Sequence, residues 1–251
     1  MKQFIKLFLF SVLVVLYFIT AAPFYLIARF FPYRARIYTT RICQLYAKAA
    51  LKVLGIKYSQ DGESSIGNRL IVANHLSYID ILLMAASRPT CFVTSVEIRR
   101  TPFLGQICEL GGCLYVERRS RDNLNEEISD ITNALMSGLN VTVFPEATST
   151  NGEELKRFKS PLFRAAINSG RSVVPVSINY KKINNSKVNM TNRDSIFWYD
   201  DMRFGPHIWN LMKFKHIDTE LVFGDEVLSS CEKKLSLISH RAVKKNLDIY
   251  L

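Results

Sequence analysis

The first 60 of the 251 residues contain no aspartate or glutamate. Nine of the 33 lysine and arginine residues lie in this stretch, which leaves 24 of them against all 22 acidic residues in the rest of the chain. The net charge of +11 is therefore concentrated at the amino terminus, where an uncharged apolar run covers residues 7–28. Positive charge beside an apolar run indicates an anionic membrane surface, and because the chain has no nucleic-acid-binding motif we expect no nucleic-acid partner.

Cysteine and histidine are also scarce. The five cysteines are an odd number, scattered along the chain without a C-x-x-C pair, and the four histidines show no metal-ligand spacing. We therefore expect a reducing compartment, no disulfide framework and no metal site. The chain has no internal repeat or low-complexity linker, and its length suits one sizeable domain.

The apolar run is long enough to cross a hydrocarbon core of ~30 Å at ~1.5 Å per residue. It is open to three interpretations: a cleaved signal peptide, a transmembrane helix, or a membrane-dipping helix broken near Pro23 and followed by an amphipathic helix over about 34–53. The amphipathic helix would turn these residues toward lipid: Ile37, Ile42, Leu45, Ala49 and Leu54. More basic residues follow the apolar run than precede it. We thus expect residues 1–57 to anchor the chain in the inner (cytoplasmic) membrane and residues 58–251 to form a domain facing the cytoplasm.

The remainder alternates between patterns typical of strands and of helices. Strands are predicted near 69–73, 90–95, 113–117, 140–144, 173–179 and 217–223, and helices near 78–87, 101–109, 122–137, 159–169, 207–214 and 230–248. This alternation predicts a single α/β domain with a largely parallel or mixed sheet flanked by helices. The aromatic stretch 196–204 is expected either in the core or at a membrane interface or acyl-chain pocket.

The motif with the most chemistry is Asn74-His75-x-x-x-x-Asp80, which follows the apolar run 70–73. On one continuous helix, side chains five residues apart point roughly 140° apart and cannot meet. They meet only if His75 lies in the turn before a helix and Asp80 in its first turn, and Ser77 with Asp80 forms an S-x-x-D pattern that makes Ser77 the N-cap. A histidine held by a carboxylate can take a proton from a hydroxyl near neutral pH. The alternative is a capping carboxylate beside a turn histidine.

Three further patterns follow at predicted strand ends: G-C-L-Y-V-E-R at 112–118, F-P-E-A-T-S at 144–149 and V-P-V at 174–176. Together with the first motif they resemble, in order, the four blocks N-H-x-x-x-x-D, G-x-x-[FY]-[IV]-x-R, F-P-E-G-T-x-S and V-P-[VI] of the glycerolipid acyltransferases, the family that includes lysophosphatidic acid acyltransferase. Two departures stand out. Ala147 replaces the usual glycine of the third block, whose missing β-carbon permits a close backbone approach. The segment F-K-S-P-L-F at 158–163 looks more like bacterial members that act on phospholipid or ornithine-lipid acceptors.

The resemblance and the chemistry of the side chains together predict the roles in the site. His75 is the general base on the acceptor hydroxyl, and Asp80 fixes its tautomer and stabilises the imidazolium. Arg118 binds the acceptor's phosphate or other anionic head group, because a guanidinium can bind phosphate bidentately. Glu146 pairs with Arg118 or with an acceptor hydroxyl. The hydroxyls of Thr148 and Ser149 donate to phosphate, and the supporting residues are Asn74, Gly112, Pro145 and Lys159.

These roles imply an O-acyltransferase that moves a fatty acyl group from acyl-CoA or acyl carrier protein to the free hydroxyl of a lysolipid. The expected acceptor is 1-acyl-glycerol-3-phosphate, giving phosphatidic acid in phospholipid biosynthesis; lyso-ornithine lipid or another lysophospholipid is the alternative. No cofactor is expected beyond the thioester co-substrate, and since no serine or cysteine sits in a nucleophile elbow, direct attack on the thioester is favoured. Two other functions are weighed against transfer: a non-catalytic, membrane-bound lipid-binding protein and a lipid hydrolase.

Overall fold

The computed structural model describes residues 2–62, 68–117 and 122–250. Its described strands form one mixed sheet in the order β1-β8-β6-β2-β5-β3-β4, with β7 paired to β6. The strands are β1 (Ile56–Asp61), β2 (Leu70–Ala73), β3 (Cys91–Ser95), β4 (Leu114–Val116), β5 (Val141–Val143), β6 (Val173–Ile183), β7 (Ser186–Lys187) and β8 (Ile217–Phe223). β6 pairs antiparallel with β7 and β8, and the other neighbours pair in parallel. The predicted mixed α/β sheet is confirmed.

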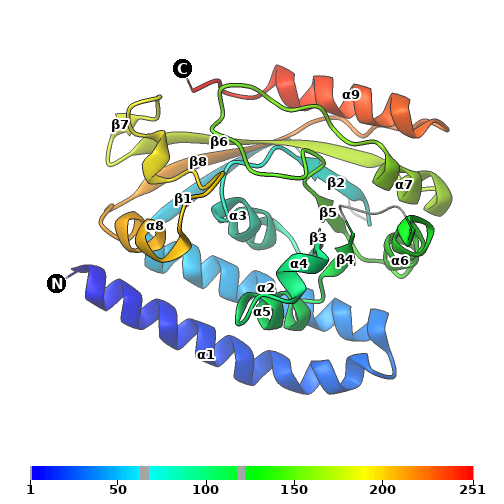
Figure 1. Cartoon of the computed structure of the whole chain (residues 1–251), viewed down its shortest axis with the longest axis horizontal. Helices are drawn as coiled ribbons and strands as arrows, with labels where there is room; N and C mark the ends of the chain where they lie inside the picture. Colours follow the sequence, from blue (N-terminus) through cyan, green and yellow to red (C-terminus); the bar gives the residue numbers. More distant parts are fainter. Residues whose placement is uncertain (1, 63–67, 118–121, 251) are drawn as a thin grey trace.

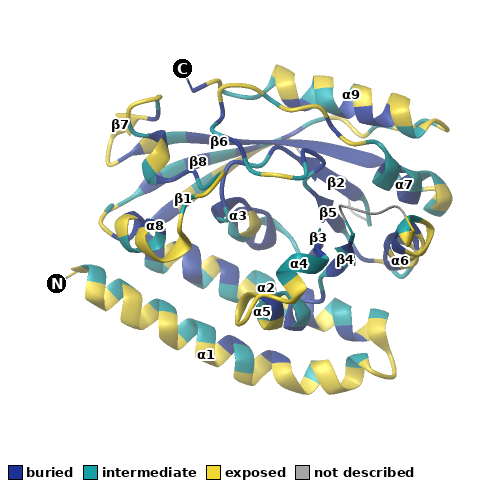
Figure 2. Cartoon of the chain, in the orientation of Figure 1, coloured by how far each residue is buried: buried dark blue, intermediate teal, exposed yellow. Residues whose placement is uncertain are grey.

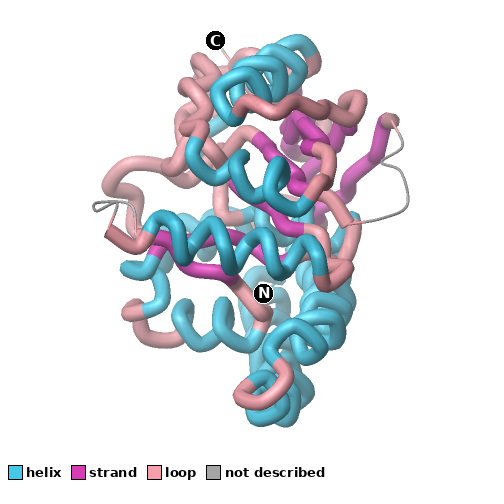
Figure 3. Tube along the Cα trace, turned by 90° about the vertical axis from the view of Figure 1, so that its right-hand side faces the viewer, coloured by secondary structure: helices cyan, strands magenta, loops and turns pink. Residues whose placement is uncertain are grey.

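Helices cover both faces of this sheet (Figures 1 and 3). They are α1 (Lys2–Ala28), α2 (Pro32–Leu54), α3 (Ile79–Ser87), α4 (Val96–Arg99), α5 (Leu104–Leu110), α6 (Leu124–Met136), α7 (Arg164–Ser169), α8 (Phe204–Leu211) and α9 (Glu232–Lys245). α2 and α3 contribute to one buried cluster, whereas α6, α7 and α9 contribute to the other. The sheet therefore lies between two layers of helix.

The central strand β2 is short and entirely apolar because both of its faces are covered. Leu70 and Val72 belong to the cluster shared with α6 and α9, whereas Ile71 and Ala73 belong to the cluster shared with α2 and α3. All four residues have no exposed surface. The carboxyl end of β2, where the first motif begins, is thus held from both sides.

α1 and α2 form a helical hairpin beneath the domain (Figure 1). The break near Pro23, which one of the three interpretations required, is absent, because α1 includes that proline and continues to Ala28. The prediction that Leu54 faces lipid is wrong: the side chain is completely buried, in the core cluster that α2 shares with α3. Ile37 and Ile42 likewise pack against buried clusters, whereas Leu45 is exposed. The division of the chain at residue 57 stays a prediction.

The outward face of α1 is apolar and uncovered (Figure 2). Phe4, Phe8, Ile19 and Leu26 each expose more than 60% of their surface. Within the described part of the chain, α1 is the helix long and apolar enough to cross a membrane by length and composition. Its inward face packs on the rest of the protein, with Ala21 fully buried.

Other predicted elements differ from the structure in detail. The helix expected at 101–109 begins later, as α5 at Leu104, because it follows Pro102 and Phe103 with its positive φ of 66°; the short helix α4 before them was not predicted. β1 was not predicted, since it is an edge strand whose residues are mostly exposed and give no apolar alternation. In the aromatic stretch, Phe197 is buried in the core as one interpretation expected, whereas Phe204 is about half exposed; a membrane interface or acyl-chain pocket there stays a prediction.

Candidate active site

The first motif brings a histidine and a carboxylate together at the carboxyl end of β2. His75 Nδ1 lies 2.8 Å from Asp80 Oδ2; Asp80 is completely buried and the His75 side chain is 19% exposed. His75 lies in the turn before α3, and Asp80 is in the first turn of that helix. This is the arrangement that the spacing required.

Asp80 is surrounded by hydrogen-bond donors. Its Oδ2 atom also accepts the backbone N–H groups of Leu76 (2.6 Å) and Ser77 (2.9 Å). Its Oδ1 atom accepts the hydroxyl of Tyr180 from β6 at 2.7 Å. Every donor to Asp80 favours the ionised carboxylate, since a protonated acid could not accept them all.

The cap of α3 differs from the expected S-x-x-D pattern. The helix begins at Ile79, and Ser77 Oγ makes no hydrogen bond to any described residue. Ser77 acts through its backbone: its N–H donates to Asp80 Oδ2, and its carbonyl accepts Asp80 N–H at 3.1 Å. The acid half of the capping pattern therefore forms, and the prediction of Ser77 as a hydroxyl cap is wrong.

The imidazole of His75 is held from a second direction by an aromatic ring. It stacks on Phe144, with ring centroids 4.2 Å apart and planes 16° apart. Phe144 in turn lies parallel to Phe92 of β3, 6.5 Å away. With Asp80 at one edge and Phe144 on one face, the imidazole is held from two directions.

Glu146 supports the same loop through the backbone. Its Oε1 accepts His75 N–H at 2.8 Å and its Oε2 accepts Lys156 N–H at 2.9 Å. Burial raises the pKa of the Glu146 carboxyl to about 7, opposed by the two backbone hydrogen bonds. Glu146 therefore fixes the backbone on which the histidine stands, while its expected contact with Arg118 or an acceptor hydroxyl stays a prediction.

Asn74 performs a comparable task between strands. Its amide nitrogen donates to the carbonyl of Ile178 at 3.1 Å, and its amide oxygen accepts Ile178 N–H at 2.8 Å. The side chain is buried, so it pairs the end of β2 with β6 where the ladder stops. This supports a role in aligning the loop.

Ala147 adopts the left-handed backbone conformation, with φ of 63°. Glycine takes this conformation readily, whereas a β-carbon makes it cost about 1–2 kcal/mol. The glycine usual in the third block of the resembled family therefore suits the backbone angle at this position. This chain keeps the turn despite the alanine.

The second block is described only up to Glu117, and Arg118 lies outside the described residues. Its glycine, Gly112, has φ of 75°, and a β-carbon there would lie 2.9 Å from Thr39 Oγ1 of α2. The Gly112 carbonyl accepts Arg36 Nε at 3.2 Å. Gly112 thus allows the sharp turn from α5 into β4 while lying against α2.

The remaining predicted residues lie on the loop after β5. Pro145 is buried and its carbonyl accepts the backbone N–H of Lys159 at 2.9 Å, while the Lys159 side chain is exposed. Thr148 is exposed and Ser149 half-buried. Thr150, whose N–H donates to the His75 carbonyl at 3.0 Å, connects this loop to the loop that carries His75.

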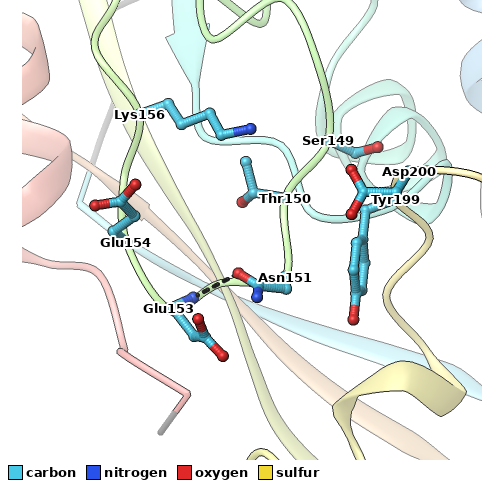
Figure 4. A pocket seen from close by; sticks show the side chains of 8 residues that line it. All are labelled: Ser149, Thr150, Asn151, Glu153, Glu154, Lys156, Tyr199 and Asp200. Carbon is cyan, nitrogen blue, oxygen red and sulfur yellow. Dashed lines mark hydrogen bonds between the residues drawn. The ribbon is translucent and has the colours of Figure 1, made fainter.

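Ser149 and Thr150 also line an open pocket of about 350 Å³ (Figure 4). Its other lining residues are Asn151, Glu153, Glu154, Lys156, Tyr199 and Asp200. Glu153 is ion-paired with Arg193 at 2.5 Å. The pocket therefore borders the loop that carries His75, and its lining has more acidic than basic side chains.

Tyr180, the described side chain that donates to Asp80 Oδ1, was not among the predicted site residues. Tyr180 lies one residue beyond the predicted end of its strand and outside all four blocks. Its position on β6 gave a usable signal, because side chains two residues apart on a strand share a face.

The comparisons with known proteins agree with this geometry. The acyltransferase family matches residues 51–179. Lyso-ornithine lipid O-acyltransferase of Brucella abortus is 28% identical over 200 residues, 76% of this chain and 75% of the relative. The 1-acyl-sn-glycerol-3-phosphate acyltransferase of Neisseria gonorrhoeae is 30% identical over 177 residues, 70% of this chain and 67% of the relative. The crystal structure of the 1-acyl-sn-glycerophosphate acyltransferase of Thermotoga maritima matches with a TM-score of 0.63 and 22% identity over 98% of each chain, a likeness of fold.

Proposed function

This chain belongs to the acyltransferase family, and we propose that it moves a fatty acyl group from a thioester to the free hydroxyl of a lysolipid with His75 as the general base. The observation that carries this proposal is the 2.8 Å contact between His75 Nδ1 and the buried Asp80 carboxylate. Because Asp80 accepts a proton-bearing Nδ1, the neutral ring presents an unprotonated Nε2 to the acceptor hydroxyl.

In the reaction, Nε2 of His75 takes the hydroxyl proton as the acceptor oxygen attacks the thioester carbonyl. Asp80 stabilises the imidazolium that forms, without itself taking the proton. Collapse of the tetrahedral intermediate breaks the carbon–sulfur bond, and the imidazolium returns its proton to the leaving thiolate. The products are the acylated lipid and a free thiol, and the base is regenerated.

The thioester donor in this proposal is acyl-CoA or acyl carrier protein, and His75 and Asp80 carry out these steps without a cofactor or metal. Arg118 follows β4 by two residues, and we assign it to the anionic group of the acceptor on the strength of the second block. The hydroxyls of Thr148 and Ser149 are offered to the same group from the loop after β5.

The acceptor we propose is 1-acyl-glycerol-3-phosphate, on which the Neisseria relative acts by its name. Lyso-ornithine lipid is the second candidate, and two observations favour it: the F-K-S-P-L-F segment and the pocket beside Thr150. With Glu154 and Asp200 in its lining and Glu153 already paired, the pocket suits the ammonium group of an amino-acid head group better than a phosphate alone. Replacing Asp200 with asparagine should then raise the KM for lyso-ornithine lipid more than that for the phosphate acceptor.

We also propose that the protein is bound to the cytoplasmic face of the inner membrane, with α1 lying along the surface. Lys6 Nζ donates to the carbonyls of Leu54 (2.8 Å) and Phe214 (2.6 Å). Farther along α1, the Tyr17 hydroxyl donates to the Ile107 carbonyl (3.0 Å). α1 is therefore tied alongside the domain. A perpendicular α1 would bring α2 and its exposed basic side chains into the hydrocarbon core, at a large cost. An in-plane α1 buries its apolar face and leaves those side chains at the headgroups.

The experiment that tests the proposed function is thiol release by the full-length protein in detergent, given acyl-CoA with and without a lysolipid. Release that depends on the acceptor supports acyl transfer, and product lipid identified from a panel of lysolipids gives the acceptor. Release without acceptor would make the protein a hydrolase. If no thiol is released from acyl-CoA or from an acyl carrier protein thioester, the result would support the non-catalytic lipid-binding alternative.

A further inference from the structure

Asp80 has a fourth hydrogen-bond donor that comes from a distant part of the chain. Tyr180 of β6 is 1% exposed, and its hydroxyl donates to Asp80 Oδ1 at 2.7 Å. The three donors on Oδ2 all come from residues 75–77, immediately before α3. Tyr180 is therefore the partner that ties the carboxylate of the catalytic loop to the sheet.

Tyr180 is itself held firmly in place. Its backbone N–H donates to the hydroxyl of Tyr250 at 2.6 Å, and its ring packs edge-on against Phe197 with centroids 5.3 Å apart. Its strand lies in the interior of the sheet, paired with β2 on one side and β8 on the other. A rigid donor at Oδ1 fixes the rotation of the carboxylate, so that Oδ2 points at the histidine.

The phenol also stays protonated. Burial and the neighbouring Asp80 charge raise the pKa of Tyr180 well above its ordinary value. Tyr180 therefore donates to Asp80 at every pH at which the enzyme works, and it draws part of the negative charge away from the side facing His75.

We propose that Tyr180 is a positioning residue for the acyl transfer, which sets both the orientation and the effective charge of Asp80 toward His75. This inference rests on the proposed role of His75 and Asp80 as the catalytic pair. It names a residue outside the four sequence blocks and assigns it a function in the reaction.

The proposal predicts the direction in which the pH profile of the reaction shifts when the Tyr180 hydroxyl is removed. Without the phenol hydroxyl, the His75–Asp80 pair holds its first proton more tightly, whichever of the two side chains carries it, because the negative charge loses a donor. The base then stays protonated up to a higher pH, and the midpoint of the acid limb of the kcat/KM profile moves to higher pH. The other titratable groups facing this network are Tyr78, Tyr250 and Glu146. They are the same in the wild type and in a Tyr180→Phe variant, so the difference between the two profiles reports on Tyr180.

The test is the pH profile of acceptor-dependent thiol release by full-length Tyr180→Phe in detergent. We expect the midpoint of the acid limb to rise by about one pH unit and kcat to fall about tenfold, with the KM for acyl-CoA unchanged. Tyr17→Phe is the matched control. It removes a buried phenol hydroxyl that donates to the backbone carbonyl of Ile107 at 3.0 Å and bonds neither Asp80 nor Tyr180.

Both variants should lose thermal stability, but only Tyr180→Phe should shift the acid limb. An unshifted limb in Tyr180→Phe, or equal shifts in both variants, overturns the positioning role and leaves a structural one. Failure of the proposed function looks different, since the wild type itself would then show no acceptor-dependent release.

Discussion

Replacing Asp80 with asparagine isolates the effect of one buried charge, because the surrounding donors dictate how the amide must sit. Asp80 Oδ2 accepts two backbone N–H groups, from Leu76 and Ser77, in addition to His75 Nδ1. An amide NH₂ cannot face those backbone donors, so the asparagine oxygen must take this place. The NH₂ group then faces Tyr180, whose hydroxyl can rotate to accept it. The histidine therefore keeps its proton on Nδ1.

The expected loss follows from the charge alone. An opposite charge within hydrogen-bond distance raises the pKa of a base by ~1–3 units, and each unit corresponds to a factor of ten in the protonation equilibrium. We therefore expect Asp80→Asn to lower kcat/KM for the acceptor by ~10–10³-fold. Reversal of the histidine tautomer would cost ~10⁴-fold instead. The acid limb of the pH profile should move downward, opposite to the shift expected for Tyr180→Phe.

The assay is kcat/KM for the lysolipid as a function of pH, measured with saturating acyl-CoA on protein shown to be folded by its unfolding transition. A loss near 10⁴-fold would refute the argument that the backbone donors orient the amide. A loss smaller than about twofold would refute the role of the Asp80 charge, since the proton transfer would then proceed equally well without it.

Four further predictions follow from single features. Ala147 and Gly170 both have φ of 63°, so Ala147→Gly should stabilise the protein by ~0.5–1 kcal/mol and Gly170→Ala should destabilise it by a similar amount. Denaturant unfolding measures both changes, and changes of the same sign in the two variants would contradict the strain argument. The pKa of Glu146 is raised from 4.5 to about 7, so its ionisation opposes folding; stability should fall by roughly 3 kcal/mol in all as the pH rises from about 4.5 to about 7, a slope that Glu146→Gln should flatten. Arg118→Ala should raise the KM for the lysolipid with little effect on that for acyl-CoA, and lysine should rescue it only in part; a raised acyl-CoA KM alone would move Arg118 to the donor site. Alkaline carbonate or high salt should fail to strip the protein from vesicles while detergent releases it, since ~0.8 kcal/mol per buried CH₂ outweighs ~1 kcal/mol per basic residue; full-length protein soluble without detergent would contradict the anchor.

The amino-terminal part shows where sequence reasoning stops. Composition predicted a long apolar helix followed by an amphipathic one, and both are present as α1 and α2. Our proposal that α1 lies along a membrane surface depends on contacts that no local pattern encodes, such as Lys6 with the Phe214 carbonyl. The same contacts change the design of a truncation: removing residues 1–57 would take Leu51 and Leu54 out of the core that α3 shares.

Local pattern was most informative where the backbone itself constrains the residue type. The spacing between His75 and Asp80 required a turn followed by a helix start, and the structure has this arrangement. The departure at Ala147 was visible in the sequence, but its cost was not, because a residue letter does not report the sign of φ. The bonding of Glu146 to two backbone N–H groups was equally hidden, since backbone partners leave no trace in side-chain patterns.

The place of Tyr180 could be predicted from the sequence only in part. Its strand carries Val174, Val176 and Ile178 at two-residue intervals, and all four side chains lie in the cluster that α3 covers. Strand alternation therefore predicts the face on which Tyr180 lies, and a polar hydroxyl on a face otherwise apolar requires a partner. What alternation cannot supply is the register between β6 and the loop before α3, 100 residues apart in the chain. That register is set by the pairing of β6 with β2 and by the Asn74 amide bonded to Ile178, so the fold as a whole brings the phenol to Asp80.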